Sequence, residues 1–378
     1  MQLPDTAFDR FPGVEMWNNN TPVSEDCLYL NMFVPRTSKT NIPTLIWIFG
    51  GSFVYGSATL DIYDGRYLAA TQSVIVVTIP YRMGVQGFLY TGTDDAPGNM
   101  GLLDQQLAIK WIYDNIEVFG GDRNKITLFG ESSGAASISH HLIAPTSWPY
   151  FNNAIMLSGT SLSHWSVESP TYLLAHTHHL ANITNCSHTD SSEMVKCLRN
   201  MDAYDLENKQ WGLNNKYIGT FLPTVDGYFL KSDPQTLINS GKIKKTDIML
   251  GSTKDEGEFF LLYFYQDVIL PSNLRTPVGL SLSQYEDLVC RTVNCDSDMV
   301  KGAVKYIYEQ SNIPDNRGSH MDLLDDICKY YITSGVIRLI YSFIFVSNIH
   351  VVSLSVFQCR VGVLLVLQPL DYTHEGLI

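Results

Sequence analysis

The sequence lacks the features that nucleic-acid-binding and membrane-spanning proteins rely on. It carries 25 Lys and Arg residues against 38 Asp and Glu, a net charge of −13, and contains no long basic run. This balance argues against nucleic acid as a main partner and mildly favours a cationic one. No stretch supplies the roughly 18 to 25 uninterrupted apolar residues that a membrane-spanning helix needs.

Motifs for cofactor binding and for export are also missing. The sequence has no metal-ligand cluster and no phosphate-binding glycine loop. Cys290 and Cys295 have no histidine partners close by, so we interpret this pair as structural and predict no metal and no cofactor. The N-terminal segment MQLPDTAFDR has neither the basic nor the apolar region of a secretory signal.

The cysteines and glycosylation sequons nevertheless indicate an extracellular protein. Cys186 and Cys197 bracket ten polar-rich residues, which predicts a disulfide between them. Sequons begin at Asn19, Asn182 and Asn185 and would suit a glycosylated, secreted surface. Because the chain has seven cysteines, at least one has no partner within it.

Short apolar, β-branched runs alternate with a helical segment in the first two thirds of the chain. Leu103, Leu107 and Trp111 repeat at i, i+4 and are followed by Gly120 and Gly121, which predicts a helix that stops there. Strands buried on both faces and alternating with helices predict an α/β fold with a central, mostly parallel sheet. The predicted strands are TLIWIF (44–49), VIVVTI (74–79), KITLF (125–129), NAIMLSG (153–159) and DIMLGS (247–252).

The end of the chain differs in composition from the rest. From about Thr333 it is strongly apolar, but Arg338, Asn348 and His350 are among the residues that interrupt it. We therefore predict one main domain over 1–333, incomplete towards its C-terminal end, and a divergent tail over 334–378. A foreign or mistranslated tail is the favoured origin, with a buried native segment or a membrane anchor as alternatives.

A serine nucleophile is indicated by the stretch LFGESSGAA. Ser132 lies between Gly130 and Gly134 at the spacing GxSxG, after a predicted strand and before a helix-compatible segment. This is the context of a nucleophile elbow, in which flanking glycines let a sharp turn hold the serine in a strained conformation with its hydroxyl exposed.

Two further parts of an acyl-transfer site occur in the expected order. The stretch IWIFGGSFVYG runs from a strand into Gly50, Gly51 and Ser52, a loop whose consecutive N–H groups could bind a developing oxyanion together with the N–H of Ser133. Asp255 and Glu256 follow the strand at 247–252 and suit an acid that orients a histidine. The pattern alone does not choose between these two carboxylates.

These motifs resemble the type-B carboxylesterase and cholinesterase family, and within it the acetylcholinesterases most. The resemblance implies an α/β-hydrolase fold and hydrolysis of choline esters, acetylcholine first among them, through an acyl-serine intermediate. A small cationic ester would be the substrate. The matching stretches follow in order between about residues 11 and 333: SEDCLYLNMFVP, IWIFGGSFVYGSATLDIYDGRYLA, YRMGVQGFLY, APGNMGLLDQQLAIKWIYDNIEVFGGD, ITLFGESSGAAS, FLPTVDGYFL and GSTKDEGEFFLLY.

By that resemblance Ser132 is the nucleophile, and Glu256, not Asp255, is the orienting acid. The oxyanion donors would be the N–H groups of Gly51, Ser52 and Ser133. Ser52 stands where the family usually has glycine and Ser133 where it usually has alanine. Neither difference removes an N–H group, so we expect at most a small change in how well the oxyanion is stabilised.

The resemblance also implies where a choline ester binds. Trp17 and Phe259 match the aromatic residues that hold a quaternary ammonium by cation–π attraction, and Tyr63 and Glu131 match their supporting residues. Trp211 matches the aromatic residue at the rim of the gorge.

The acyl pocket resembles the family less closely. Trp165 and Phe221 match bulky positions of that pocket, but Tyr217 and Gly219 stand where acetylcholinesterases usually carry two phenylalanines. A pocket with less steric exclusion would admit longer acyl groups, since one methylene is worth only about 1 to 3 kcal/mol.

Two elements of the family pattern are missing. Cys27 would normally bond a cysteine further upstream than this chain reaches. No His-Gly-X-Glu motif follows Glu256, and of the later histidines only His374 lies at a plausible spacing, without matching neighbours. We therefore predict that this chain is weakly active or inactive.

The resemblance leaves other functions open. A general carboxylesterase is one alternative, and a catalytically silent, cholinesterase-like binding or adhesion protein is another. We expect a secreted or cell-surface protein by resemblance to the family. The sequence does not decide between monomer and homo-oligomer, nor whether the protein associates with a membrane.

Overall fold

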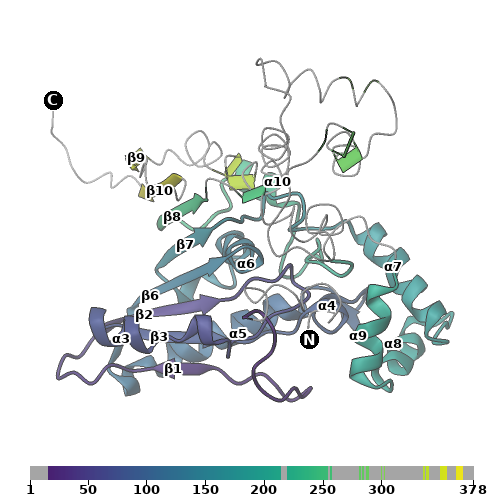
Figure 1. Ribbon diagram of the computed structural model, residues 1–378, viewed down its shortest axis with the longest axis horizontal. Helices are drawn as coiled ribbons and strands as arrows, with labels where there is room; N and C mark the ends of the chain where they lie inside the picture. The colour runs from purple at the N-terminus through teal and green to yellow at the C-terminus, as the bar shows by residue number, and fades with distance from the viewer. Residues whose placement is uncertain are drawn as a thin grey trace.

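The computed structural model describes residues 16–213, 219–253 and 256–257, a few isolated positions between 281 and 339, and the backbone of 350–355 and 363–368. Within these residues the main feature is an eight-stranded sheet with helices on both sides (Figure 1). Its strand order is β1-β3-β2-β6-β7-β8-β10-β9. The strands are β1 (Asn31–Phe33), β2 (Ile42–Ile48), β3 (Ile75–Ile79), β6 (Gly121–Glu131), β7 (Asn153–Leu157), β8 (Asp247–Ser252), β9 (His350–Ser355) and β10 (Val363–Gln368), with β4 (Tyr90–Thr93) and β5 (Ala96–Pro97) forming a separate pair.

The centre of the sheet is parallel, as the sequence predicts. Strands β3, β2, β6, β7 and β8 pair in parallel, whereas β1, β10 and β9 pair antiparallel. Every residue of β3 is buried, because both faces of the sheet are covered. All five predicted strands are present within a few residues of their expected bounds, and the α/β fold class is confirmed.

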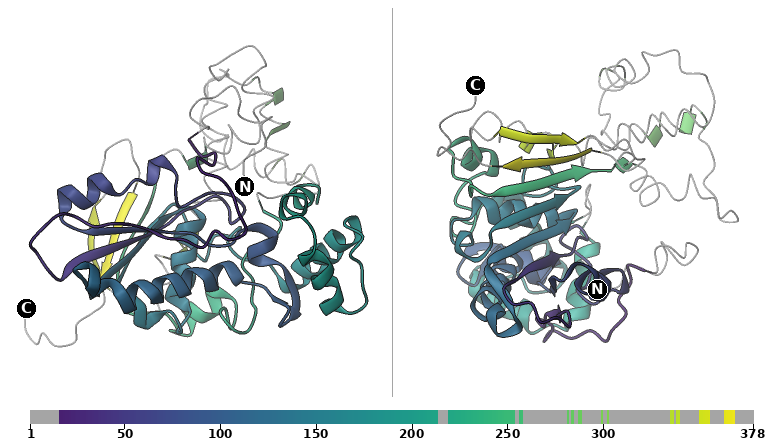
Figure 2. Two further views of the ribbon diagram at one scale, coloured as in Figure 1. Left: turned by 90° about the horizontal axis from the view of Figure 1, so that it is seen from below. Right: turned by 90° about the vertical axis from the view of Figure 1, so that its left-hand side faces the viewer.

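Helices cover the sheet on opposite faces. Parallel strands are joined by right-handed crossovers, so the step from β2 out to β3 and the return steps to β6 and β7 place their helices on different faces. Figure 2 shows α3 on one face, and α5 and α6 on the other. The α-helices are α3 (Arg66–Gln72), α4 (Gly84–Phe88), α5 (Met100–Asn115), α6 (Ser133–Ile143), α7 (Pro170–Ile183), α8 (Ser191–Arg199), α9 (Ala203–Trp211) and α10 (Pro234–Asn239), and the 3₁₀-helices are η1 (Asp61–Tyr63), η2 (Ile116–Phe119) and η3 (Trp148–Tyr150).

Helix α5 is present as predicted, but the repeat that indicated it does not mark its buried face. Leu107 is 68% exposed and Trp111 43% exposed. The buried side chains are instead those of Leu102, Gln105, Ile109 and Ile112, which are spaced three or four residues apart. Because one member of this face is a polar glutamine, counting apolar residues does not find it.

Helix α6 is buried at every one of its residues. Its sequence, SGAASISHHLI, is rich in glycine, alanine and serine, whose small side chains let it pack closely. It contacts β6, β7 and β2 on the sheet and α10 on its outer side. The helix that follows Ser132 is therefore fixed from several directions.

The last two strands lie within the predicted tail. β10 pairs with β8 in the register Leu365 to Leu250, and β9 pairs with β10, so both extend the sheet at the edge opposite β1 (Figure 2). The sequence analysis did not anticipate these strands. The boundary at residue 333 itself stays a prediction. No helix among the described residues is long and apolar enough to cross a membrane.

The predicted disulfide is present. Cys186 and Cys197 are bonded, with their Cα atoms 5.5 Å apart, and they link the end of α7 to α8. These helices and α9 lie together beside the sheet (Figure 1). Cys27 is exposed and has no disulfide partner in the described part of the chain.

Candidate active site

Ser132 occupies a tight turn between β6 and α6. Its backbone angles are φ 53° and ψ −122°, a conformation that costs free energy for a residue with a side chain. A Cβ atom on Gly134 would lie 2.0 Å from the carbonyl oxygen of Ile48, and one on Gly130 would lie 2.6 Å from that oxygen. Only glycine fits at these two positions, so the geometry confirms the strained elbow expected from GxSxG.

The glycine loop after β2 lies against this elbow. Gly51, Ser52 and Phe53 all have positive φ, and the N–H of Val54 donates to the carbonyl of Gly51 at 2.9 Å. A Cβ atom on the neighbouring Gly50 would lie 3.0 Å from the Cβ of Ser132. The fold thus brings Gly50, which directly precedes two of the predicted oxyanion donors, against Ser132, which directly precedes the third.

Glu256 lies just beyond β8 and is held by two hydrogen bonds. Its Oε1 accepts from the backbone N–H of Thr253 at 2.6 Å and from the hydroxyl of Ser158. The N–H of Ser158 donates to Gly251, and the N–H of Ser132 donates to Leu157 at 2.8 Å. Glu256 is therefore bonded just beyond the ends of β7 and β8, and Ser132 is bonded to the last residue of β7. Asp255, the other carboxylate considered, lies outside the described residues.

A second carboxylate, Glu131, lies directly before Ser132. Burial, and to a smaller extent the negative charge of Glu256, raise its pKa to about 7. A Cβ atom on Gly50 would lie 2.9 Å from its Oε2, so the glycine loop packs against this carboxylate as well. Glu131 therefore changes its charge near neutral pH unless a cation stabilises its ionised form.

Trp17 and Tyr63 belong to a row of aromatic rings. The centroids of Trp17 and Tyr63 are 6.4 Å apart, those of Tyr63 and Trp47 5.1 Å, and those of Trp47 and Phe129 4.8 Å. Trp47 and Phe129 are register partners on β2 and β6, and Phe129 shares its face of β6 with Glu131 two residues on. Burial raises the pKa of Tyr63, and the negative charge of Glu131 contributes to this rise.

This row joins the predicted choline-site residues to the sheet. Two of its members, Trp47 and Phe129, were not predicted from the sequence. Trp47 and Phe129 sit inside apolar strand sequences, where an aromatic residue is ordinarily part of the core. Only their facing register across β2 and β6 could have indicated that they belong beside Tyr63.

The residues predicted for the acyl pocket and the rim are only partly brought to the site. Phe221 is completely buried, and Trp165 is half-buried against the core. A Cβ atom on Gly219 would lie 3.1 Å from the carbonyl oxygen of Ser52, so this segment packs on the glycine loop after β2. Trp211 ends α9 and is 41% exposed. Phe259 and Tyr217 lie outside the described residues.

No histidine bonds to Ser132 in the part of the chain that the structure describes. His140 bonds the carbonyl of Ser166 through Nε2, and His141 bonds Ser147 and Gln105. Burial lowers the pKa of His140 to about 4 and that of His141 to about 3, so both are neutral near pH 7. His320 and His374 lie outside the described residues.

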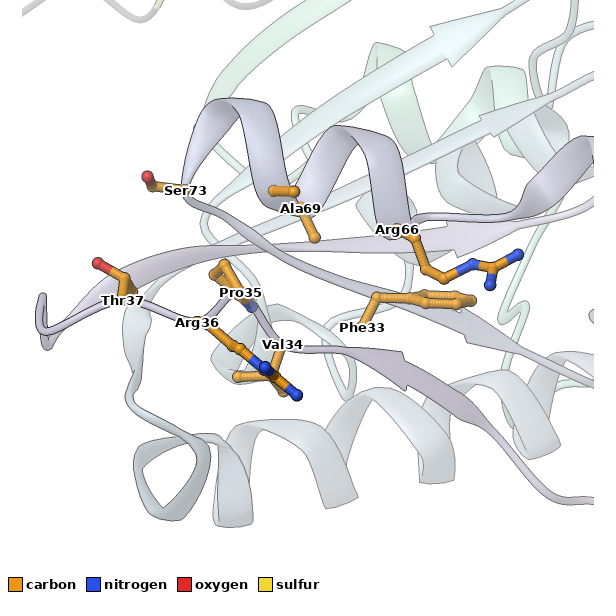
Figure 3. Close-up of a pocket in the computed structure, with 9 residues that line it drawn as sticks. Phe33, Val34, Pro35, Arg36, Thr37, Arg66, Ala69 and Ser73 are labelled. Atoms are coloured by element: carbon orange, nitrogen blue, oxygen red, sulfur yellow. The ribbon is translucent and has the colours of Figure 1, made fainter.

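Other sites among the described residues are weaker candidates. A groove of about 560 Å³ lies between the end of β1 and α3, where Phe33, Arg36 and Arg66 are among the lining residues (Figure 3). None of the predicted site residues lines it. No group of three or more His, Cys, Asp or Glu residues in the described ranges could hold a metal ion.

Comparisons with known proteins agree with this geometry. The model of the carboxylesterase family matches residues 3–352. The chain is 49% identical over 263 residues to a cholinesterase of Mus musculus, covering 68% of this chain and 44% of that protein. It is 44% identical over 267 residues to an acetylcholinesterase of Danio rerio, covering 69% and 42%. Acetylcholinesterase 1 of Caenorhabditis elegans is 38% identical over 352 residues, covering 89% and 56%.

The chain spans about half the length of the curated relatives it matches. The family match nevertheless includes every part of the site described above, from Trp17 to Glu256. With its mostly parallel sheet, its strained serine elbow and this match, the chain belongs to the carboxylesterase family of carboxylic ester hydrolases and has their α/β-hydrolase fold.

Proposed function

We propose that this protein is a serine esterase that acts on choline esters, with acetylcholine as the first candidate. The observation that carries this proposal is the packing of the glycine loop after β2 against the Ser132 elbow, with the row from Trp17 to Phe129 beside Glu131. This packing supports a site in which the proposed nucleophile, the proposed N–H donors and the proposed cation-binding residues would act together. The cholinesterase names of the relatives support the same substrate class.

In the proposed reaction the Oγ of Ser132 attacks the ester carbonyl carbon. The carbonyl oxygen takes the negative charge and is stabilised by the N–H groups of Gly51, Ser52 and Ser133. The choline oxygen then leaves with the serine proton, and water later attacks the acyl-serine to release the acid and restore Ser132. By resemblance to the family, Glu256 is proposed to occupy the position of the acid that would orient a histidine base carrying these protons.

The charged end of the substrate is proposed to lie against Trp17. An aromatic face attracts a quaternary ammonium by about 0.5 to 2 kcal/mol, more when water is excluded. Glu131 adds a negative charge at the inner end of the same site. Phe259 is proposed as a second aromatic contact and Trp211 as a first contact at the rim, both by resemblance to the family.

The acyl end is proposed to lie near Gly219, with Trp165 and Phe221 around it. Gly219 packs on the oxyanion loop without a side chain of its own, which supports an acyl pocket wider than that of acetylcholinesterases. Longer acyl groups would then be accepted with a penalty of no more than about 1 to 3 kcal/mol per methylene.

Turnover by this chain is proposed to be slow. The sequence has no His-Gly-X-Glu motif after Glu256, and the histidines of α6 are bonded elsewhere. Loss of one triad member leaves the activity of the oxyanion donors and of binding alone, about 10³ to 10⁴ above the reaction in water. An extracellular location is proposed as well, since the disulfide between Cys186 and Cys197 suits an oxidising compartment.

Labelling by an uncharged organophosphate tests the nucleophile and the missing base together. We expect mass spectrometry to find the adduct on Ser132, formed at least about a hundredfold more slowly than in a complete cholinesterase, because no base activates the hydroxyl. Ser132→Ala should give no adduct, and Ser133→Ala, its neighbour, should still be labelled.

An adduct on another residue would contradict the assignment of Ser132. Labelling as fast as in a complete cholinesterase would show that this chain supplies a base. A third outcome is that Ser132 is labelled and that hydrolysis of acetylthiocholine and of phenyl acetate is accelerated equally over the uncatalysed rates. This outcome would favour a general carboxylesterase.

Replacing Trp17 tests the cation site. Trp17→Ala should raise KM for acetylthiocholine about tenfold or more, since a cation–π contact of about 2 kcal/mol is lost, while KM for phenyl acetate stays within about twofold. Trp111→Ala is the matched control, because Trp111 lies on the outer side of α5 and is 43% exposed. An equal rise of KM for both substrates in Trp17→Ala would show that Trp17 contributes packing but does not select cations.

The raised pKa of Glu131 predicts how affinity for a cation depends on pH. The carboxyl is neutral well below pH 7 and ionised above it, so affinity for tetramethylammonium should rise by up to about tenfold between about pH 6 and about pH 8. Glu131→Gln should remove this rise, and 3,3-dimethylbutanol, the uncharged analogue of choline, should bind equally at both pH values. Calorimetric titration that finds a falling or flat affinity for the cation would rule out ionised Glu131 as its partner.

A further inference from the structure

A group of buried polar side chains connects α5 to α6 behind the proposed site. Gln105, Ser137 and His141 each have no exposed surface, and Ser147 has only 1%. Each of them is hydrogen-bonded to another member of the group. Buried polar side chains are costly unless satisfied, so a satisfied group of this kind fixes a particular arrangement of the helices that carry it.

The direction of every bond in this group follows from chemistry. The Oε1 of Gln105 can only accept, so the Nε2 of His141, 3.1 Å away, must carry the proton. Burial keeps His141 neutral, as its lowered pKa indicates. Its Nδ1 is then an acceptor and receives the hydroxyl proton of Ser147 at 2.8 Å.

The chain of bonds begins near the surface and ends beside the nucleophile. The Nε2 of Gln106 donates to Ser147 at 2.7 Å at one end. At the other end the Nε2 of Gln105 donates to the Oγ of Ser137 at 3.1 Å, and this hydroxyl donates to the carbonyl oxygen of Ser133 at 2.9 Å. A helical serine often bonds the carbonyl four residues earlier. Here Gln105 holds the serine in the rotamer that does so.

Ser133 is the first residue of α6 and a proposed oxyanion donor. Ser132, at the N-cap, makes no side-chain capping bond, so this first turn is not fixed by the usual cap. A bond that fixes the carbonyl of Ser133 restrains the orientation of the residue and with it the direction of its N–H. Displacing a group of the site by about 1 Å can cost as much as a hundredfold in rate.

We propose that Gln105, Ser137 and His141 are positioning residues, which hold the first turn of α6 so that the N–H of Ser133 points at the developing oxyanion. The proposal rests on the proposed esterase function of Ser132 and adds to it a set of residues that never contact substrate. It also explains why α5 buries Gln105 against α6 while Leu107 is exposed.

Two serine variants of the same helix test this role. Ser137→Ala removes the bond to Ser133, whereas Ser139→Ala removes an equally buried hydroxyl that bonds Ser161 at 2.8 Å instead. For an uncharged organophosphate we expect Ser137→Ala to lower the maximal rate of Ser132 phosphorylation about tenfold, with the dissociation constant of the reversible complex unchanged. Ser139→Ala should lower the melting temperature similarly and leave both constants unchanged.

Equal losses of rate in the two variants, or a normal rate in Ser137→Ala, would overturn the proposal. If the parent protein does not react at all, the proposed function fails, and the positioning role is read from NMR on protein labelled with ¹⁵N-serine. The amide resonance of Ser133 should then move in Ser137→Ala and not in Ser139→Ala. An amide resonance that stays in place in both variants would refute the positioning role by itself.

Discussion

The site depends on one close backbone contact, between the carbonyl of Ile48 at the end of β2 and the two glycines around Ser132. Because Gly130 and Gly134 have no side chain, β2 and the start of α6 approach to a distance that no other residue would allow. The loop after β2 is thereby brought to the Ser132 elbow, and Gly50 lies against both Ser132 and Glu131. Any larger residue at Gly134 would separate the oxyanion loop from the serine that it is proposed to serve.

Two carboxylates, Glu131 and Glu256, lie near this contact, and the burial of Glu131 affects its protonation. Burial disfavours the negative charge of Glu131, and the nearby charge of Glu256 adds to this effect. A cation beside Trp17 would relieve that repulsion, which links the proposed substrate charge to the protonation of the site. On α6, the hydrogen-bonded side chains of Ser137 and His141 are buried together with the apolar residues that pack in the core.

Features that a local sequence pattern determines are predicted correctly. Features that depend on partners distant in the sequence are not predicted. The strands, the elbow at Ser132 and the bond between Cys186 and Cys197 follow from short-range signals, and the structure contains them. Gln105 could not be found in this way, because its burial depends on partners on another helix. Trp47 was missed since an aromatic residue inside a strand is ordinarily core. The strands at 350–355 and 363–368 were missed because the change to a strongly apolar composition was interpreted as a sign of a foreign or mistranslated tail. The roles of the site residues, which rest on resemblance, stay predictions.

The central claim is that the loop after β2 and the elbow form one oxyanion site at Ser132. A crystal structure of the protein after reaction with an organophosphate tests it most directly. The account predicts phosphorus bonded to the Oγ of Ser132, with the phosphoryl oxygen about 2.7 to 3.1 Å from the backbone nitrogens of Gly51, Ser52 and Ser133. A phosphoryl oxygen that points away from these nitrogens, or phosphorus bonded to another residue, would contradict it.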